Sequence, residues 1–220
     1  MIAVVDYRKG NLRSVERGLA AAGADARITD DARQIARAQA IVLPGVGAFA
    51  DAAASMEELG QLEAVRERIA AGVPFLGICL GMHLMFEEGD EGAPGEGSPD
   101  YDGLSRPRGL AVLPGVVTKM PATDAAGNAY KVPHVGWNTV VPTFASPLFA
   151  GIDPGTYFYF THSYIAPDGP FVVAQTEHSV VFPSAVHYGD VAFGVQFHPE
   201  KSSDAGAQLL RNFVRIVEGA

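Results

Sequence analysis

In the first part of the chain, short continuous runs of hydrophobic residues alternate with segments in which hydrophobic residues recur at helical spacing. Short apolar runs at 2–5, 40–45 and 73–78 each fit a buried strand. Helical spacing recurs after the first run at four positions: Leu12, Val15, Leu19 and Ala22. Asn11 precedes this helix and is expected to cap it, and residues 58–72 form a second helical pattern. Strands alternating with helices predict βαβ units in a doubly wound parallel sheet.

The remainder of the chain is richer in strand patterns. Residues 89–107 are dense in glycine, proline and acidic residues without periodicity, so we expect a surface loop and assign it no chemistry. Short β-rich runs joined by turns follow. The last helix is expected to bury one face formed by Leu210, Phe213, Val214 and Val217. These patterns predict one α/β domain over 1–220, with a mixed, mostly parallel central sheet and flanking helices.

Composition narrows the class of protein. A content of 48% hydrophobic and 19% charged residues is typical of a folded globular protein. The formal charge of −9 disfavours binding to nucleic acid or to an anionic membrane. The first apolar run is short and ends at Asp6, unlike a signal peptide, and no run approaches the length of a membrane span. We therefore expect a cytoplasmic location.

The single cysteine lies in a glycine-flanked turn. Cys79 is the centre of Gly-Ile-Cys-Leu-Gly at 77–81, between an apolar run and the segment LGMHLMFEE, which can form a helix. This is the arrangement of a nucleophile elbow, in which glycines allow a sharp turn from strand to helix. A helix N-terminus favours a thiolate, and the Leu80 amide can face an oxyanion. The alternative, a small buried hydrophobic residue, is disfavoured by the flanking glycines.

A histidine and a carboxylate lie close together near the C-terminus. In GVQFHPEKS (194–202), His198 and Glu200 are two positions apart, so in an extended segment both side chains point to one face. Pro199 stiffens the link between them. A cysteine, a histidine and a carboxylate supply the nucleophile, base and orienting group of an acyl transfer. A histidine beside proline can also be structural, so this hypothesis depends on Cys79.

The remaining histidines give no metal site. They are scattered and have no second cysteine to join, unlike the ligands of zinc sites. We expect no metal and no cofactor. From spacing alone, five histidines are assigned structural roles: His83, His134, His162, His178 and His187.

The two motifs together closely resemble those of the class I glutamine amidotransferases. Four further segments resemble the glutaminase subunits of imidazole glycerol phosphate synthase: DYRKGNLRSV (6–15), LPGVGAF (43–49), PHVGWN (133–138) and YFYFTHSY (157–164). The resemblance implies a flavodoxin-like fold and a glutaminase that feeds ammonia to a separate (β/α)8 cyclase subunit. That partner would make imidazole glycerol phosphate and aminoimidazole carboxamide ribotide, in histidine biosynthesis.

The resemblance also implies roles for individual residues. Cys79 would attack the glutamine carboxamide, His198 would protonate the departing ammonia, and Glu200 would orient His198. Backbone groups at Val46 and Leu80 would form the oxyanion hole. Four side chains would line the glutamine pocket: His83, His162, Ser163 and Tyr164. Six residues would face the cyclase: Asn11, His134, Trp137, Asn138, Tyr159 and Lys201.

Some features depart from the resemblance or leave alternatives open. Arg8 stands where this family usually has glycine, and His83 where it usually has glutamine. Trp137 and Tyr159 lie in β-rich runs and could be core aromatic residues. Other class I glutaminases, serving anthranilate, guanylate or carbamoyl phosphate synthesis, are the nearest alternative, although they lack the PHVGWN segment. A cysteine peptidase and a non-catalytic interaction subunit are the alternatives from other classes.

Overall fold

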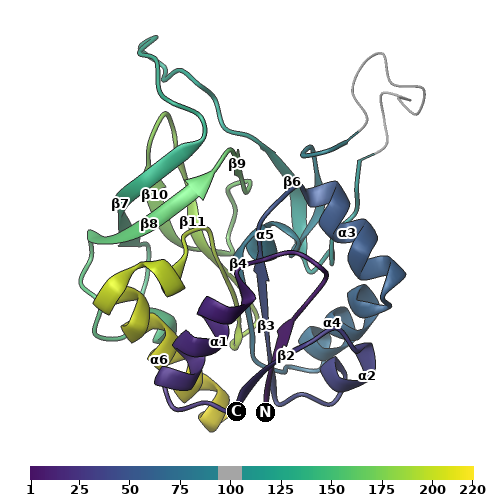
Figure 1. The fold of residues 1–220 in the computed structure, drawn as a ribbon. Helices are drawn as coiled ribbons and strands as arrows, with labels where there is room; N and C mark the ends of the chain where they lie inside the picture. Colours follow the sequence, from purple (N-terminus) through teal and green to yellow (C-terminus); the bar gives the residue numbers. More distant parts are fainter. Residues whose placement is uncertain (94–105) are drawn as a thin grey trace.

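The computed structural model describes residues 1–93 and 106–220 (Figure 1). Most of the predicted 89–107 loop therefore lies outside the described residues. The main sheet contains nine strands: β1 (Ile2–Val5), β2 (Ala26–Thr29), β3 (Ala40–Gly45), β4 (Phe75–Cys79), β7 (His134–Pro142), β8 (Thr156–His162), β10 (Val172–Glu177), β11 (Val181–Tyr188) and β12 (Ala192–Val195). Their spatial order is β2-β1-β3-β4-β12-β11-β10-β7-β8.

The direction of the strands confirms the predicted mixed sheet. Strands β2, β1, β3, β4 and β12 form a contiguous parallel block. In the other half, each strand is antiparallel to its neighbour. Among the described strands of this sheet, β11 and β7 therefore run in one direction and the other seven in the opposite direction. A second, small sheet is formed by β5 (Phe86–Gly89), β6 (Leu113–Lys119) and β9 (Tyr164–Ile165).

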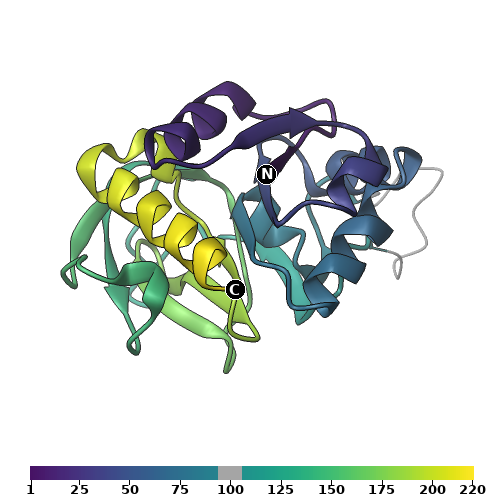
Figure 2. The same cartoon turned by 90° about the horizontal axis from the view of Figure 1, so that it is seen from below.

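Helices cover both faces of the parallel block. The α-helices are α1 (Leu12–Ala21), α2 (Ala32–Ile35), α3 (Phe49–Glu58), α4 (Gln61–Ala70), α5 (Leu80–His83) and α6 (Ser203–Gly219), and the short 3₁₀ helices are η1 (Pro147–Phe149) and η2 (Pro199–Lys201). Helices α1 and α6 lie side by side on one face, as Figure 2 shows, and α2, α3 and α4 cover the other. No helix in the described part of the chain is long and apolar enough to cross a membrane.

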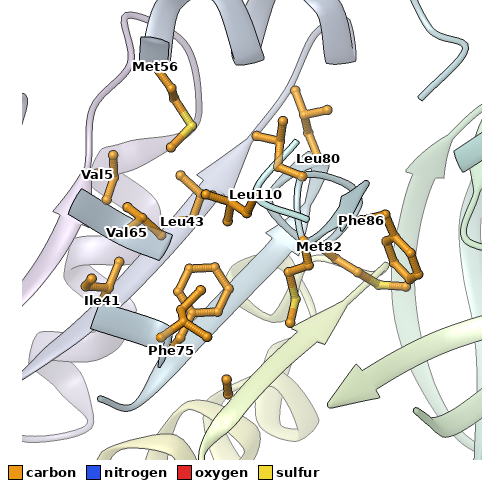
Figure 3. Packing of buried hydrophobic residues seen from close by; sticks show 14 of the residues in the cluster. Val5, Ile41, Leu43, Met56, Val65, Phe75, Leu80, Met82, Phe86 and Leu110 are labelled. Atoms are coloured by element: carbon orange, nitrogen blue, oxygen red, sulfur yellow. The ribbon is translucent and has the colours of Figure 1, made fainter. Parts of the chain in front are cut away.

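The apolar runs bury side chains on both faces of the sheet. Figure 3 shows Val5, Ile41 and Leu43 of the strands packed with Met56 of α3 and Val65 of α4. Because side chains alternate along a strand, the intervening residues pack against the opposite helices. That second cluster includes Val4, Val42, Leu76, Val15, Leu19, Leu210 and Phe213. The predicted buried faces of α1 and α6 are therefore confirmed.

Several local predictions were wrong. Asn11 occupies the N-cap position of α1, but its side chain makes no capping hydrogen bond. The predicted 58–72 helix is confirmed as α4, but it begins only at Gln61, because Gly60 adopts a left-handed φ of 65°. Helix α3, which ends at Glu58, was not predicted. Strand β2 and the single turn α2 were not predicted, since neither is long enough to show a clear period.

The helix predicted after Cys79 is only one turn long. Helix α5 ends at His83, and Phe86–Gly89 is strand β5 instead. The backbone carbonyls of this segment accept hydrogen bonds from a distant part of the chain: Leu110 N–H donates to Leu84 O (2.7 Å) and Gly109 N–H to Glu87 O (2.9 Å). Tertiary pairing therefore overrides the local helical pattern.

Candidate active site

The turn that carries Cys79 is tight. Cys79 is the last residue of β4 and has φ 53° and ψ −106°, a conformation that costs a non-glycine residue about 1–3 kcal/mol. A Cβ on Gly77 would lie 2.5 Å from the Gly81 carbonyl oxygen, and one on Gly81 would lie 1.7 Å from the Leu43 oxygen. The predicted requirement for glycine is thus confirmed, and its cause is close backbone contact. The turn leaves the Leu80 N–H at the start of α5, beside the thiol.

The sulfur of Cys79 contacts groups from two other strands. The Cys79 Sγ lies 3.9 Å from the Thr161 carbonyl oxygen of β8. The side-chain amide of Gln196, which follows β12, donates to Sγ over 3.7 Å. Gln196 was not among the predicted site residues, although it belongs to the same GVQFHPEKS segment as His198. Gln196 is a polar residue between the hydrophobic residues Val195 and Phe197, and this position is the signal that could have identified it.

His198 and Glu200 form a buried pair. Nδ1 of His198 lies 2.9 Å from Oε1 of Glu200, and the side chains are only 2% and 1% exposed. The prediction that one extended segment aligns them was wrong. His198 is extended, but Pro199 begins the 3₁₀ turn η2, and this turn brings the carboxylate back to the ring. The Ser202 hydroxyl donates to the His198 carbonyl (2.6 Å) and fixes the turn.

The environment of His198 favours its protonated form. Burial by itself lowers the pKa of His198, but the adjacent Cys79 and Glu200 outweigh burial and raise the pKa to about 9. Nε2 of His198 has no hydrogen-bond partner among the described residues. The ring can therefore hold a proton at neutral pH and deliver it through Nε2 to a group bound at Cys79.

A cavity of about 410 Å³ opens beside Cys79. It is lined by Val46, Gly47, Ala48, Cys79, Leu80, His83, Glu91, Pro133, Thr161, His162, Ser163 and Tyr164. The structure thus brings together all four predicted glutamine-pocket residues. Gly45 pairs with Cys79 in the β3–β4 register, so Val46 follows next to the elbow. Glu91 lies in the segment to which no chemistry was assigned, and burial raises the pKa of its carboxyl.

Comparison with known proteins agrees with this geometry. The family model of class I glutamine amidotransferases matches residues 3–217. The chain belongs to this family.

Among curated proteins, this amidotransferase is similar over its whole length to the HisH subunits of imidazole glycerol phosphate synthase. It is 41% identical to the protein of Geobacillus sp. strain WCH70, over 100% of this chain and 98% of that one. It is 43% identical to the protein of Moorella thermoacetica, over 100% and 96%. The amidotransferase therefore belongs with the HisH proteins, and the cysteine peptidase alternative does not apply.

Solved structures share its fold. A crystal structure of a glutamine amidotransferase has a TM-score of 0.70 at 20% identity and covers 99% of this chain and 100% of its own. The structure of PurLQS from Thermotoga maritima has a TM-score of 0.67 at 16% identity, over 97% of each chain. These similarities confirm the class I amidotransferase fold.

Two histidines of the amidotransferase form a hydrogen-bonded relay next to the pocket. His162 Nδ1 lies 2.9 Å from the Tyr164 carbonyl oxygen and therefore donates to it. His162 Nε2 then accepts from His134 Nδ1 (3.0 Å), and His134 Nε2 accepts from the Asn138 amide (3.3 Å). This order requires neutral rings, and burial lowers the pKa of His162 to about 3 and of His134 to about 4. His134 is buried beneath the surface, so direct contact with a partner is not supported for it.

Three other residues predicted to face a partner gather on the outer face of β7 and β8. Trp137 is 51% exposed and lies opposite Tyr159, with ring centroids 6.2 Å apart. The Lys201 ammonium lies 5.7 Å from the centre of the Tyr159 ring. Trp137 is thus no core residue. Asn11 precedes α1, which packs against η2 near Lys201, whereas Asn138 bonds inward to Glu177 O (2.8 Å).

Proposed function

We propose that this chain is the glutaminase subunit of an imidazole glycerol phosphate synthase, a single domain that cleaves glutamine and delivers the ammonia to a cyclase subunit. Full-length similarity to HisH subunits carries this proposal. A cytoplasmic location fits a nucleophile that must remain a reduced thiol.

The first half of the proposed reaction forms a thioester. The Cys79 thiolate attacks the carboxamide carbon of glutamine, and the carbonyl oxygen becomes an oxyanion. Backbone N–H groups near Leu80 and Val46 stabilise that charge, since both lie at the elbow. His198 carries a proton at neutral pH because its pKa is about 9, and it gives this proton to the departing nitrogen. The C–N bond breaks, ammonia leaves, and a glutamyl thioester remains.

The second half regenerates the thiol. His198, now neutral, takes a proton from a water molecule as the water attacks the thioester carbon. The C–S bond breaks, glutamate leaves, and the sulfur returns to its starting state. Throughout, Glu200 holds Nδ1 of His198 and so keeps Nε2 directed toward the reacting groups.

The remaining pocket residues fit the amino-acid part of glutamine. The positive α-ammonium group of glutamine needs an anionic contact, and its negative α-carboxylate needs a hydrogen-bond donor or a cation. Glu91 is the carboxylate that lines the cavity and can receive the α-ammonium group. His162, Ser163 and Tyr164 also line the cavity, and we place the binding of the α-carboxylate there, through backbone N–H groups and the Ser163 hydroxyl.

The proposed docking surface combines exposed apolar area with one cation. Trp137 and Tyr157 are 51% and 59% exposed on neighbouring strands. Exposed aromatic side chains are enriched at protein–protein interfaces, so this pair favours a binding surface. Lys201 directly follows the catalytic Glu200 and lies over Tyr159. Asn11 lies at the nearby end of α1. Because this surface adjoins the triad, ammonia released there has a short path to a docked cyclase.

Glutamine turnover by the purified chain, alone and with a HisH-compatible cyclase subunit carrying its nucleotide ligand, tests the proposal. We expect almost no turnover alone and strong stimulation in the complex. Full activity of the isolated chain, or a complex that fails to form, would contradict the proposed partnership.

A further inference from the structure

A chain of polar contacts reaches the nucleophile without involving His198 or Glu200. Gln196 is completely buried directly after β12. Its Nε2 lies 3.7 Å from Cys79 Sγ, and its Oε1 lies 2.7 Å from Nε2 of His83. His83 is itself buried in the single turn that follows Cys79. Two side chains from distant parts of the sequence therefore form one contact path that ends on the reacting atom.

The two contacts of Gln196 depend on each other. A carboxamide presents a donor at one end and an acceptor at the other, and a half-turn exchanges them. His83 meets the oxygen end, so its Nε2 must carry the proton and donate. With Oε1 held there, the NH₂ group has to face the sulfur. If the donor were lost, the amide could reverse and direct its oxygen at Sγ, which would oppose a thiolate.

We propose that Gln196 is a catalytic residue that stabilises the Cys79 thiolate by donating a hydrogen bond to Sγ, and that His83 is the positioning residue that fixes the Gln196 amide in the donating orientation. This inference rests on the proposed role of Cys79 as nucleophile. It also gives a role to the histidine that stands where the family usually has glutamine, because either side chain can donate to Oε1.

The other ionisable groups around the sulfur are compatible with this role. His198 and, through it, Glu200 face Cys79 from the end of β12, and Tyr7 faces it from the end of β1. Burial raises the pKa of Tyr7 far above neutrality, so its hydroxyl stays uncharged. Burial lowers the pKa of His83 to about 4, so its ring stays neutral at physiological pH, as the donation from one nitrogen requires.

Alkylation of the thiol by iodoacetamide tests the proposal without a partner or a turnover assay. The thiolate attacks the CH₂ carbon, iodide leaves, and only the thiolate reacts appreciably. Because Cys79 is the only cysteine in the chain, the pH profile of alkylation reports on this residue alone. Gln196→Glu and Gln196→Leu should slow alkylation at pH 7 by roughly tenfold, the size of a hydrogen bond to a charged group, and move the profile to higher pH.

The variants at position 83 form the matched pair. His83→Gln keeps a donor toward Oε1 and should react within about twofold of wild type. His83→Leu removes the donor and should slow alkylation toward the rate of the Gln196 variants. Circular dichroism identifies any variant that fails to fold, and the pair at position 83 and the pair at 196 each test the proposal independently.

His198→Gln separates the two levels of inference. If this variant slows alkylation while all changes at 196 and 83 leave the profile unchanged, Cys79 is still activated by His198 but the Gln196 proposal is overturned. If His198→Gln also leaves the profile unchanged, the triad itself is contradicted. Equal rates for His83→Gln and His83→Leu would overturn the role of His83.

Discussion

Nδ1 of His198 and Oε1 of Glu200 lie 2.9 Å apart in a pair that is almost completely buried. The pairing commits one ring nitrogen to the carboxylate and leaves Nε2 for proton transfer at Cys79. In the proposed mechanism the catalytic work is therefore divided: His198 moves the proton, and Glu200 fixes the ring that carries it.

Removing the two partners should therefore have unequal effects. His198→Ala removes the proton donor, and glutamine-dependent kcat/KM should fall by roughly 10³–10⁴-fold. Glu200→Gln keeps a polar group at Nδ1, so about 10²-fold more activity should remain than in His198→Ala. Steady-state kinetics of the complex measures both. Equal residual rates would contradict this division of roles.

The catalytic motifs could be predicted because their chemistry is local in sequence. Backbone atoms leave no room for a Cβ at Gly77 or Gly81, so glycine is required on both sides of Cys79. Glu200 lies only two positions from His198. Such constraints act within a few residues and can be recognised in the chain. The central strands β1, β3 and β4 of the parallel sheet were equally predictable, because each is a continuous apolar run, whereas the edge strand β2 is not.

Features set by distant contacts could not be predicted. The segment after Cys79 has a helical pattern, but pairing with residues 109–113 holds it as strand β5 after a single helical turn. Glu91 gave no signal because it lies in a stretch with loop composition. The inward orientation of His134 and the outward orientation of Trp137 depend on the β7 register, which a β-rich run alone does not fix.

Folding stability should decline as the pH falls below about 6.5. Burial lowers the pKa of His83 and His134 to about 4 and of His162 to about 3. The unfolded chain binds protons at these rings below its own pKa near 6.5, whereas the folded chain does not, so the free energy of unfolding decreases with falling pH. Urea unfolding between pH 7 and 5 measures this, and His83→Gln should reduce the loss by about 2 kcal/mol.

On the alkaline side the sign reverses. The folded pKa of His198 is raised to about 9, so its stabilisation is complete below 6.5 and is lost as pH rises from 6.5 to 9. Glu200→Gln removes one cause of the raised pKa and should flatten this limb. A stability that is constant from pH 5 to 9 in the wild-type chain would contradict both assignments.

The backbone at Arg8 provides a test of the first turn. Arg8 adopts a left-handed φ of 70°, and its exposed ion pair with Glu58 adds little. Arg8→Gly and Arg8→Ala both lose that pair, but only glycine adopts the conformation without strain. The glycine variant should therefore be more stable than the alanine variant by about 1 kcal/mol in denaturant unfolding. An alanine variant of equal or greater stability would show that this turn is unstrained.

Lys201 tests the docking surface. Lys201→Ala removes the exposed cation over Tyr159 and should weaken cyclase binding by roughly 3- to 30-fold, without a change in the unfolding midpoint. Arg37→Ala is the matched control. Arg37 is an exposed residue that carries the same charge, and it lies just before β3, at the amino-terminal end of the parallel strands, whereas Cys79 lies at their carboxyl end. Titration calorimetry with the cyclase subunit compares the two. An equal loss of affinity for both variants would indicate a general charge effect instead of a docking contact.

The central claim is that Cys79 serves only to produce ammonia for a partner synthase. Its most direct test is synthesis of imidazole glycerol phosphate by the complex of the Cys79→Ala variant with the cyclase subunit, supplied in parallel with glutamine or with ammonium salt. We predict that glutamine-dependent synthesis is abolished, while ammonia-dependent synthesis stays near the wild-type rate. Loss of both activities, or persistence of glutamine-dependent synthesis, would contradict the account.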